Sequence, residues 1–173
     1  ISQSRLFGAY NLNNILAAIA IGLHYDIPLK LIHEAIEAFE PIELRSQVIE
    51  KNSQRIFVDA FNANPTSMKV SLESFCRIKS HKKIAIIGDM LELGHSSHKE
   101  HQNIVSFCKD LDFDTIIFIG EEFLRVKDKN AGLFFSNTRR AKRWIKKQNF
   151  TNSDIFLKGS RGVSLEKLLR FIH

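Results

Sequence analysis

The sequence has few cysteines and no long apolar run. Only two of its 173 residues are cysteine, Cys76 and Cys108, and neither belongs to a CxxC pair. This scarcity argues against a disulfide scaffold and against a cysteine-based zinc or redox motif. We therefore expect two buried, free thiols. No run approaches the roughly 20 apolar residues that span a bilayer, so we expect no insertion into a membrane.

A phosphate-binding loop is also missing from the sequence. No GxxxxGK[ST] pattern is present, because neither Gly-Lys-Ser nor Gly-Lys-Thr occurs anywhere in the chain. Without that loop, this chain cannot by itself cradle the β- and γ-phosphates of a nucleotide in the manner of a P-loop protein.

Proline is scarce, and each of the three prolines marks a boundary of an expected helix. An apolar helix is expected over residues 12–25, and a second helix begins at Pro28 and ends at Pro41. Because the first helix is apolar on nearly all sides, it requires burial by other elements, and a hairpin of about 40 residues is too short to hold a core alone. We therefore interpret residues 1–41 as the end of a larger preceding domain and residues 42–173 as a separate domain.

Beyond Pro41, apolar runs of strand length alternate with helical patterns. Two runs, 84–87 and 116–119, are continuously apolar, which is typical of strands covered on both faces. The alternation predicts an α/β fold with a Rossmann-like, mostly parallel sheet flanked by helices. The expected strands are 46–50, 55–60, 83–88, 115–120, 132–136 and 154–158, and the expected helices are about 65–79, 96–109, 121–127, 138–148 and 164–172.

The chain is basic, with a net charge of +6, and much of the excess lies in residues 139–147. At helical spacing this stretch places Ala141, Trp144 and Ile145 on one side and the cations on the other. A solvated helix face explains this pattern best. The alternative is a stripe that binds nucleic acid, which predicts an affinity that falls steeply with salt.

Polar residues follow three of the expected strands, at the edge where open α/β sheets bind ligands. After the first of these strands, Asp59 could accept hydrogen bonds from the hydroxyls of a ribose. The amides of the helix that follows Asn64 could face phosphate oxygens. The alternative is that Asp59 and Asn62 only shape the turn and that Asn64 only caps the helix, and for Asn64 we favour the cap.

The other two segments also carry charge at strand ends. Residues 88–94 place Asp89 and Glu92 between glycines, where the carboxylates could grip an ammonium group, hold a metal, or simply cap the next helix. Residues 158–162 form a small, cationic loop that suits an anion such as a carboxylate, unless it is an ordinary tight turn.

Three histidines, His95, His98 and His101, are spaced as HxxHxxH. However, His95 and His98 fall at or before the expected helix start, and no Glu or Cys completes a standard zinc motif. We therefore expect no metal site here.

Together these segments resemble the Mur ligase family, and within it the MurF type. The run Gly8–Ala18 is similar to the family's G-x-H-N-x-x-N-A-x-A-A helix start, and Asp59–Ser67 is similar to its D-S-Y-N-A-N-P-x-S motif. Gly88–Gly94 matches G-D-M-x-E-L-G, and Lys158–Arg161 matches the closing K-G-S-R. Each match is weak alone, but the NANP and GDMLELG motifs in this order and spacing are highly specific.

The resemblance implies roles for individual residues. Asn11 and Asn14 would line the adenine, Arg45 would approach the phosphates, and Asp59 would hold the ribose. Tyr10, Ala60 and Phe61 stand where the family has His, Ser and Tyr, and no residue of this chain is identified as catalytic or as a metal ligand. The residues implied on the nucleotide side are Asn11, Asn14, Arg45, Asp59, Asn62 and Asn64. Those implied on the peptide-substrate side are Asp89, Glu92, His101, Lys158, Ser160 and Arg161.

The activity that the resemblance implies is ATP-dependent addition of D-alanyl-D-alanine to UDP-N-acetylmuramoyl-tripeptide, through an acyl phosphate, in peptidoglycan precursor synthesis. This chain would supply the C-terminal domain, whereas the P-loop and the ligands of Mg²⁺ would lie in the rest of the ligase. The expected setting is the bacterial cytoplasm, with a monomeric protein that binds no nucleic acid. We expect the isolated piece to be inactive.

Two alternatives remain. Another Mur ligase or a folylpolyglutamate-type ligase is the first, and the GDMLELG motif argues against it. A non-catalytic nucleotide-binding or regulatory domain is the second, and the missing P-loop favours it for this piece. We expect Asp59→Ala or Arg45→Ala in the complete ligase to weaken ATP use and to leave the fold intact.

Overall fold

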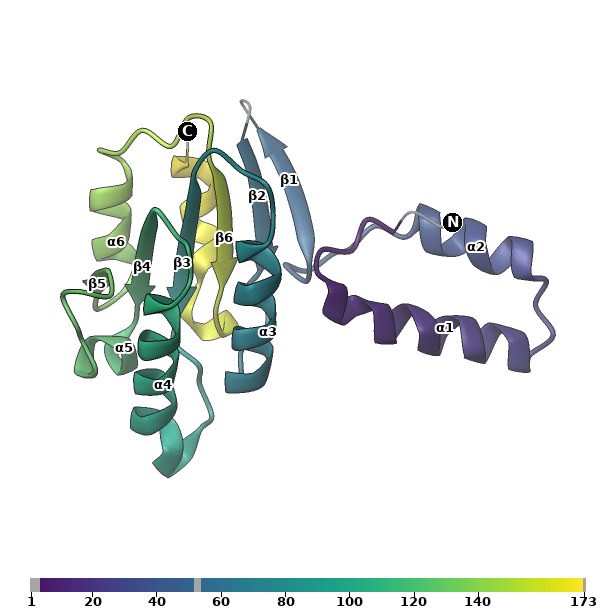
Figure 1. Ribbon diagram of the computed structural model, residues 1–173, viewed down its shortest axis with the longest axis horizontal. Helices are drawn as coiled ribbons and strands as arrows, with labels where there is room; N and C mark the ends of the chain where they lie inside the picture. Colours follow the sequence, from purple (N-terminus) through teal and green to yellow (C-terminus); the bar gives the residue numbers. More distant parts are fainter. Residues whose placement is uncertain (1–3, 52–53, 173) are drawn as a thin grey trace.

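The computed structural model describes residues 4–51 and 54–172, which form a six-stranded α/β unit and a helical hairpin that projects from it (Figure 1). The strand order is β1-β2-β6-β3-β4-β5. β1 runs antiparallel to β2, and the other neighbouring strands are parallel, which confirms the expected mostly parallel sheet. The strands are β1 (Gln47–Lys51), β2 (Gln54–Asp59), β3 (Lys83–Gly88), β4 (Thr115–Ile119), β5 (Leu133–Phe135) and β6 (Asp154–Lys158).

Helices cover both faces of the sheet, and each face has its own hydrophobic core. One core packs beneath α3 (Pro65–Cys76), α4 (Ser97–Lys109) and α5 (Glu121–Arg125). The other lies beneath α6 (Thr138–Ile145) and the 3₁₀ helix η4 (Leu165–Phe171). Two short 3₁₀ turns, η2 (Gly94–Ser96) and η3 (Arg161–Val163), lie in the loops at the ends of β3 and β6.

The central strand β3 contributes alternate side chains to the two cores. Ala85 and Ile87 pack into the core under α3, α4 and α5, whereas Ile84 and Ile86 pack into the core under α6 and η4. All four are fully buried, as the continuous apolar run predicts for a strand covered on both faces.

The first core also contains Phe7, which precedes the hairpin in the sequence. The Phe7 ring centroid lies 4.7 Å from that of Phe57 and 5.8 Å from that of Phe156. The Phe7 amide donates to the Ser46 carbonyl at 3.4 Å. The packing of the α/β unit therefore crosses the domain boundary expected at residue 41.

The hairpin consists of the turn η1 (Ala9–Asn11), α1 (Leu12–His24) and α2 (Leu29–Ala38), and lies beside the β1 edge in Figure 1. Its helices approach closely at Gly22, where a Cβ would lie 2.7 Å from the Ile32 Cδ1 atom. Many large apolar side chains of the hairpin remain exposed, including Ile21 at 60% and Leu31 at 53%. No helix in the described part of the chain combines the length and apolar character that a membrane span requires.

Several expectations from the sequence are wrong in detail. The helix expected to end at Pro41 ends at Ala38, and the helix expected to reach residue 148 ends at Ile145. The helix expected to reach residue 79 ends at Cys76, whose side chain is partly exposed, so only Cys108 is the buried thiol that we expected. The final helix is a 3₁₀ helix instead of an α-helix. A period of three places Leu165, Leu168 and Phe171 on one side, against the core, which explains this geometry.

Candidate functional site

The candidate residues gather at the carboxyl edge of the sheet. Four parallel neighbours, β2, β6, β3 and β4, end at this edge, and the loops that follow them contain the three segments that the sequence singled out. In open α/β sheets this edge is where ligands bind.

Asp59 and Lys158 form a buried ion pair. They are the last residues of β2 and β6 and lie directly opposite each other in the parallel register. The Lys158 Nζ atom donates to the Asp59 Oδ2 atom at 2.5 Å and lies 3.5 Å from the Asn62 carbonyl oxygen. The Lys158 side chain is only 2% exposed, so its ammonium group depends on this carboxylate. A residue expected on the nucleotide side is thus joined to one expected on the substrate side.

Tyr10, which was not among the selected residues because the family has His at this motif position, lies close to this pair. Its hydroxyl lies 3.4 Å from the Ser46 Oγ atom. Burial and the negative charge of Asp59 raise the pKa of Tyr10 to about 12, against a smaller opposing effect of the Ser46 hydrogen bond. The phenol is therefore protonated at neutral pH and can act as a hydrogen-bond donor.

Asn11 and Asn14 form a short amide ladder at the base of the hairpin. The buried Asn11 Nδ2 atom donates to the Phe7 carbonyl at 2.6 Å and to the Ser46 Oγ atom at 3.0 Å. Asn14 is exposed, and its Nδ2 atom donates to the Asn11 Oδ1 atom at 3.0 Å. Both donors of Asn11 are used inside the protein, where they join the two chain segments at the base of the hairpin. Asn14 is therefore the member that faces solvent.

The Phe61 ring is in contact with two arginines. The Arg45 guanidinium carbon is 3.7 Å from the centroid of the Phe61 ring, and that of Arg161 is 5.2 Å away. Both distances are within the range of cation–π attraction. The Arg161 amide also donates to the Phe61 carbonyl at 3.2 Å. The ring therefore brings together one arginine from each of the two expected groups.

Asn62 and Asn64 differ in what they do. Asn64 caps α3, since its Oδ1 atom accepts from the Ser67 amide at 2.8 Å while the Ser67 hydroxyl accepts from the Asn64 amide at 3.2 Å. This capping box confirms the cap favoured from the sequence. Asn62 is exposed next to the ion pair, with its side chain available to a ligand.

Asp89 binds the start of a neighbouring helix. Its Oδ2 atom accepts from the Glu122 amide at 3.0 Å, and its Oδ1 atom accepts from the Phe123 amide at 2.9 Å. Gly120 permits this contact, because it has φ +137° and a Cβ there would lie 2.1 Å from the Asp89 carboxylate. Burial raises the pKa of Asp89, whereas the two amide hydrogen bonds lower it. Asp89 thus caps α5, and not the helix that follows it in sequence.

His101 is fully buried in α4 and holds the loop after β3. Its Nε2 atom accepts from the Met90 amide at 3.0 Å, and its Nδ1 atom lies 2.7 Å from the Ser97 carbonyl oxygen. This pattern places the ring proton on Nδ1. The Nε2 atom is also 3.7 Å from the Asp89 Oδ1 atom.

His95 and His98 lie on the exposed surface, away from the buried His101. Within residues 4–51 and 54–172, there is no group of three or more His, Cys, Asp or Glu side chains that could hold a metal ion.

Ser160 ties the loop after β6 to the loop after β3. Its Oγ atom accepts from the Leu91 amide at 2.9 Å, and its own amide donates to the Asp89 carbonyl at 3.0 Å. The two strands approach so closely here that a Cβ on Gly159 would lie 2.8 Å from the Gly88 Cα atom. Ser160 is buried, and its two hydrogen bonds hold together the loops after β3 and β6. Glu92 and Arg161 are exposed on these same loops.

Comparisons with known proteins identify the family of this chain. The family described as Mur ligase, glutamate ligase domain, matches residues 44–150 of the chain. This chain belongs to the Mur ligase family. Two curated relatives carry the name UDP-N-acetylmuramoyl-tripeptide–D-alanyl-D-alanine ligase. The protein from Rickettsia prowazekii is 31% identical over 131 residues, which cover 73% of this chain and 29% of the relative. The protein from Bacillus subtilis is 27% identical over 175 residues, which cover 95% of this chain and 38% of the relative.

Solved structures of Mur ligases share this fold. MurF from Acinetobacter baumannii superposes with a TM-score of 0.84 and 26% identity, covering 94% of this chain and 37% of that protein. MurF ligase from Thermotoga maritima, solved in complex with ADP, superposes with a TM-score of 0.81 and 23% identity, covering 96% of this chain and 38% of that protein. This chain therefore spans little more than a third of these structures.

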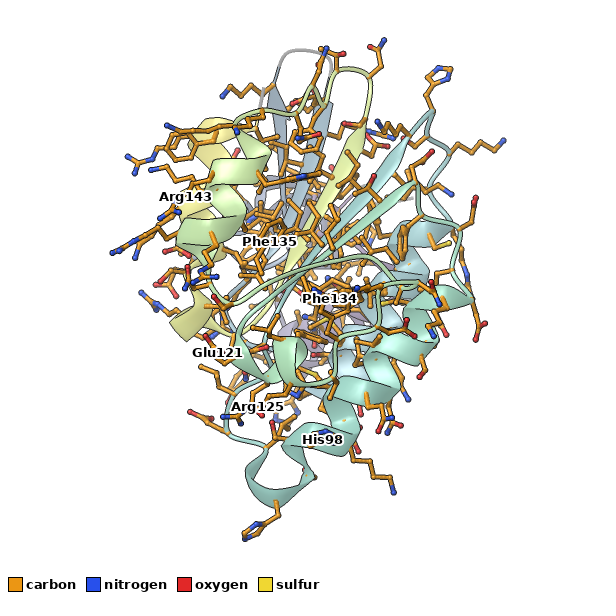
Figure 2. The ribbon with its side chains drawn as sticks, turned by 90° about the vertical axis from the view of Figure 1, so that its left-hand side faces the viewer. His98, Glu121, Arg125, Phe134, Phe135 and Arg143 are labelled. Carbon is orange, nitrogen blue, oxygen red and sulfur yellow. The ribbon has the colours of Figure 1, made fainter. Side chains whose placement is uncertain are left out.

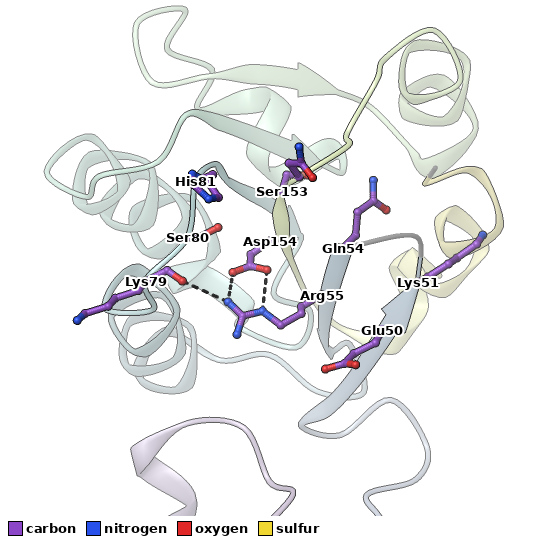
Figure 3. A pocket seen from close by; sticks show the side chains of 10 residues that line it. Glu50, Lys51, Gln54, Arg55, Lys79, Ser80, His81, Ser153 and Asp154 are labelled. Atoms are coloured by element: carbon purple, nitrogen blue, oxygen red, sulfur yellow. Dashed lines mark hydrogen bonds and ion pairs between the residues drawn. The ribbon is translucent and has the colours of Figure 1, made fainter.

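The Mur ligase domain has a second charged region at the opposite edge of the sheet (Figure 3). There the Arg55 Nε atom donates to the Asp154 Oδ1 atom at 2.9 Å, and the Arg55 Nη2 atom bonds to Asp154 Oδ2 and to the Lys79 carbonyl. A pocket of about 510 Å³ surrounds this pair. None of the site residues selected from the sequence lines this pocket. The ion pair between Arg55 and Asp154 joins the starts of β2 and β6.

Sequence reasoning on this Mur ligase domain missed Tyr10 and Phe61 as members of the site. Both lie at motif positions where the family has a different ring, and this difference was the reason to set them aside. Their positions within the motifs were the signal that could have identified them.

Proposed function

We propose that this chain is the C-terminal part of a MurF-type ligase. The complete enzyme would join D-alanyl-D-alanine to UDP-N-acetylmuramoyl-tripeptide with ATP in the bacterial cytoplasm, as a step of peptidoglycan precursor synthesis. The observation that carries this proposal is the extent of the match. Curated relatives with that name align with 93% to 97% of the chain, including the hairpin as well as the sheet.

The nucleotide side of the proposed site depends on Asp59, Tyr10 and Arg45. Lys158 occupies one oxygen of Asp59, so the Oδ1 atom is the one that could accept a ribose hydroxyl. The protonated Tyr10 phenol adds a donor beside it, and Arg45, held on Phe61, supplies a positive charge for phosphate oxygens. The Thermotoga maritima protein, which has this fold, was solved with ADP, and this supports nucleotide use in the family.

On the substrate side, we assign different roles to the exposed and the buried residues. Glu92 and Arg161 are exposed and would contact the peptide substrates directly. The remaining substrate-side residues are largely buried and make internal hydrogen bonds, so they would set the shape of the loops that present Glu92 and Arg161. The buried residues are Asp89, His101, Lys158 and Ser160.

The reaction would proceed in two steps. A carboxylate oxygen of the tripeptide attacks the γ-phosphorus of ATP, and ADP leaves to give an acyl phosphate. The free amine of D-alanyl-D-alanine then attacks the carbonyl carbon, loses a proton, and expels phosphate to form the amide. Arg45 and Arg161 would stabilise negative charge on the phosphate or carboxylate groups, because cations stabilise the charge that develops in such steps. We place the ligands of Mg²⁺ and the P-loop in the part of the ligase that this chain does not cover.

Phosphate release by the full-length ligase tests this proposal. The enzyme is supplied with ATP, Mg²⁺ and UDP-N-acetylmuramoyl-tripeptide, with and without D-alanyl-D-alanine. We expect release that depends on the dipeptide. Arg161→Gln should reduce it at least tenfold, and the matched control Arg143→Gln, on the exposed outer side of α6, should leave it unchanged. Release that is absent, or is indifferent to the dipeptide, in a folded enzyme that binds nucleotide would favour the non-catalytic alternative or a different amine substrate.

A further inference from the structure

A cationic cavity lies between α6 and η4, and none of the site residues discussed above lines it. Its volume is about 620 Å³, within the range of small-molecule pockets. Four cationic side chains line it, two from each helix, together with the hydroxyl-bearing residues Thr138 and Ser164. The cationic residues are Arg139, Lys142, Lys167 and Arg170.

The positive charge is concentrated in this part of the chain. Residues 129–153 contain seven of the 25 lysines and arginines and none of the 19 aspartates and glutamates, so the remainder of the chain has one more carboxylate than cation. Side chains that end in nitrogen extend from α6 around Arg143 in Figure 2. Such separation of charge produces a stronger local positive potential than the net charge of +6 would produce if it were spread over the whole chain.

Carboxylates do not neutralise the cavity. Within the described residues, none of the four cavity cations forms an ion pair with Asp or Glu, and Glu166, the acidic residue of η4, does not line the cavity. The Phe171 ring contacts two of the cavity cations, with Lys142 Nζ at 4.2 Å and Arg170 Cζ at 4.8 Å from its centroid. Lys146, which does not line the cavity, has its Nζ atom 4.7 Å from the same centroid. Burial and the charges of Lys146 and Arg170 lower the pKa of Lys142. This cluster of like charges would be stabilised by a bound anion.

The backbone of α6 adds further donors to the cavity. Asn137 caps the helix through the Arg140 amide, and the amides of Thr138 and Arg139 have no acceptor among the described residues. Free amides at a helix start favour anions, and phosphate oxygens are common ligands there. The Thr138 hydroxyl is already used, since it donates to the Val163 carbonyl at 2.6 Å and so joins the two walls of the cavity.

We propose that this cavity binds a small, soluble anion that carries two or more phosphate groups. Four cations around one cavity match the charge of an oligophosphate better than that of a single carboxylate. The volume of the cavity favours a small molecule. A nucleic acid or a lipid surface would instead engage the whole cationic segment, including Arg140, Arg143 and Lys147.

The test measures binding of inorganic tripolyphosphate to this chain by isothermal titration calorimetry at physiological salt. The cavity variant is Arg139→Gln/Lys142→Gln, and the matched control is Arg140→Gln/Lys147→Gln. Both variants remove one arginine and one lysine from the same segment, but only the first pair lines the cavity. Circular dichroism verifies that both variants fold.

We expect the cavity variant to bind tripolyphosphate at least tenfold more weakly than the wild type, and the control to stay within threefold. Citrate, an anion without phosphate, should bind at least tenfold more weakly than tripolyphosphate to the wild type. Three results would overturn the proposal: no tripolyphosphate binding by the wild type, equal losses in the two variants, or equal affinity for citrate. A fourth result would also overturn it: the wild type binds an RNA oligonucleotide or anionic vesicles more tightly than tripolyphosphate, and both variants lose this binding equally. The whole cationic helix face would then be the binding surface.

Discussion

The buried ion pair between Asp59 and Lys158 makes a quantitative prediction about stability. Asp59→Asn leaves the Lys158 ammonium, on a side chain only 2% exposed, with the Asn62 carbonyl at 3.5 Å as its remaining hydrogen-bond partner within residues 4–51 and 54–172. An unpaired buried charge of this kind costs about 3–5 kcal/mol of unfolding free energy. Lys158→Met should cost less, about 1–3 kcal/mol, because the Asp59 side chain is 15% exposed and can keep contact with water.

The double variant should be far more stable than the sum of the two changes suggests. With both charges removed, nothing buried is left unpaired and the Met side chain fills the space of the lysine stem, so we expect stability within about 1 kcal/mol of the wild type. The coupling free energy should therefore be at least about 3 kcal/mol.

Urea denaturation of this chain, followed by circular dichroism, measures these values. The exposed pair Lys30 and Glu34, 3.9 Å apart on α2, is the matched control, and the cycle of Lys30→Met and Glu34→Gln should give a coupling below about 1 kcal/mol. A coupling below about 1 kcal/mol at Asp59 and Lys158 would refute the reasoning. The same pair changes our expectation for Asp59→Ala, which should now cost stability as well as nucleotide binding.

Three further measurements test the remaining structural inferences. In a Tyr25→Phe variant, which leaves Tyr10 as the single tyrosine, phenolate absorbance should rise near pH 12 and not near 10, because burial and the charge of Asp59 oppose ionisation; a transition at pH 10 would contradict this environment. Burial raises the pKa of Cys108 to about 12, so a thiol reagent at pH 8 should label Cys76 quickly and Cys108 only on unfolding; rapid labelling of both thiols would show that the core is open. Gly120→Ala should destabilise the protein by at least about 1 kcal/mol in urea denaturation, because its Cβ would meet the carboxylate that caps α5; unchanged stability would mean that this contact is not formed.

The sequence predicted the fold well because its patterns are local. Continuous apolar runs identified the central strands, and the order of strands and helices implied the parallel sheet. The cap at Asn64 followed from its position before Pro65. The 3₁₀ geometry of η4 was not predicted, because an apolar residue at every third position also fits an α-helix.

The candidate site was predicted in part. Sequence motifs located the residues at the carboxyl edge, but they could not show which side chains pair. The contact between Asp59 and Lys158 joins residues 99 positions apart, and Asp89 caps a helix 33 positions away. The two arginines on Phe61 likewise come from segments far apart in sequence. Such pairings depend on strand register and loop approach, which the motifs alone do not specify.

The position of Phe7 has a consequence for how the chain is divided experimentally. An expression boundary at residue 42 would delete this ring from the core, along with the Asn11 amide that holds the Ser46 hydroxyl. By analogy with buried Phe→Ala substitutions, the loss would be about 3–5 kcal/mol, a large fraction of the stability of a domain of this size. We therefore expect a stable α/β unit to need the residues around Phe7, which precede the helical hairpin in sequence and pack in the core of the sheet.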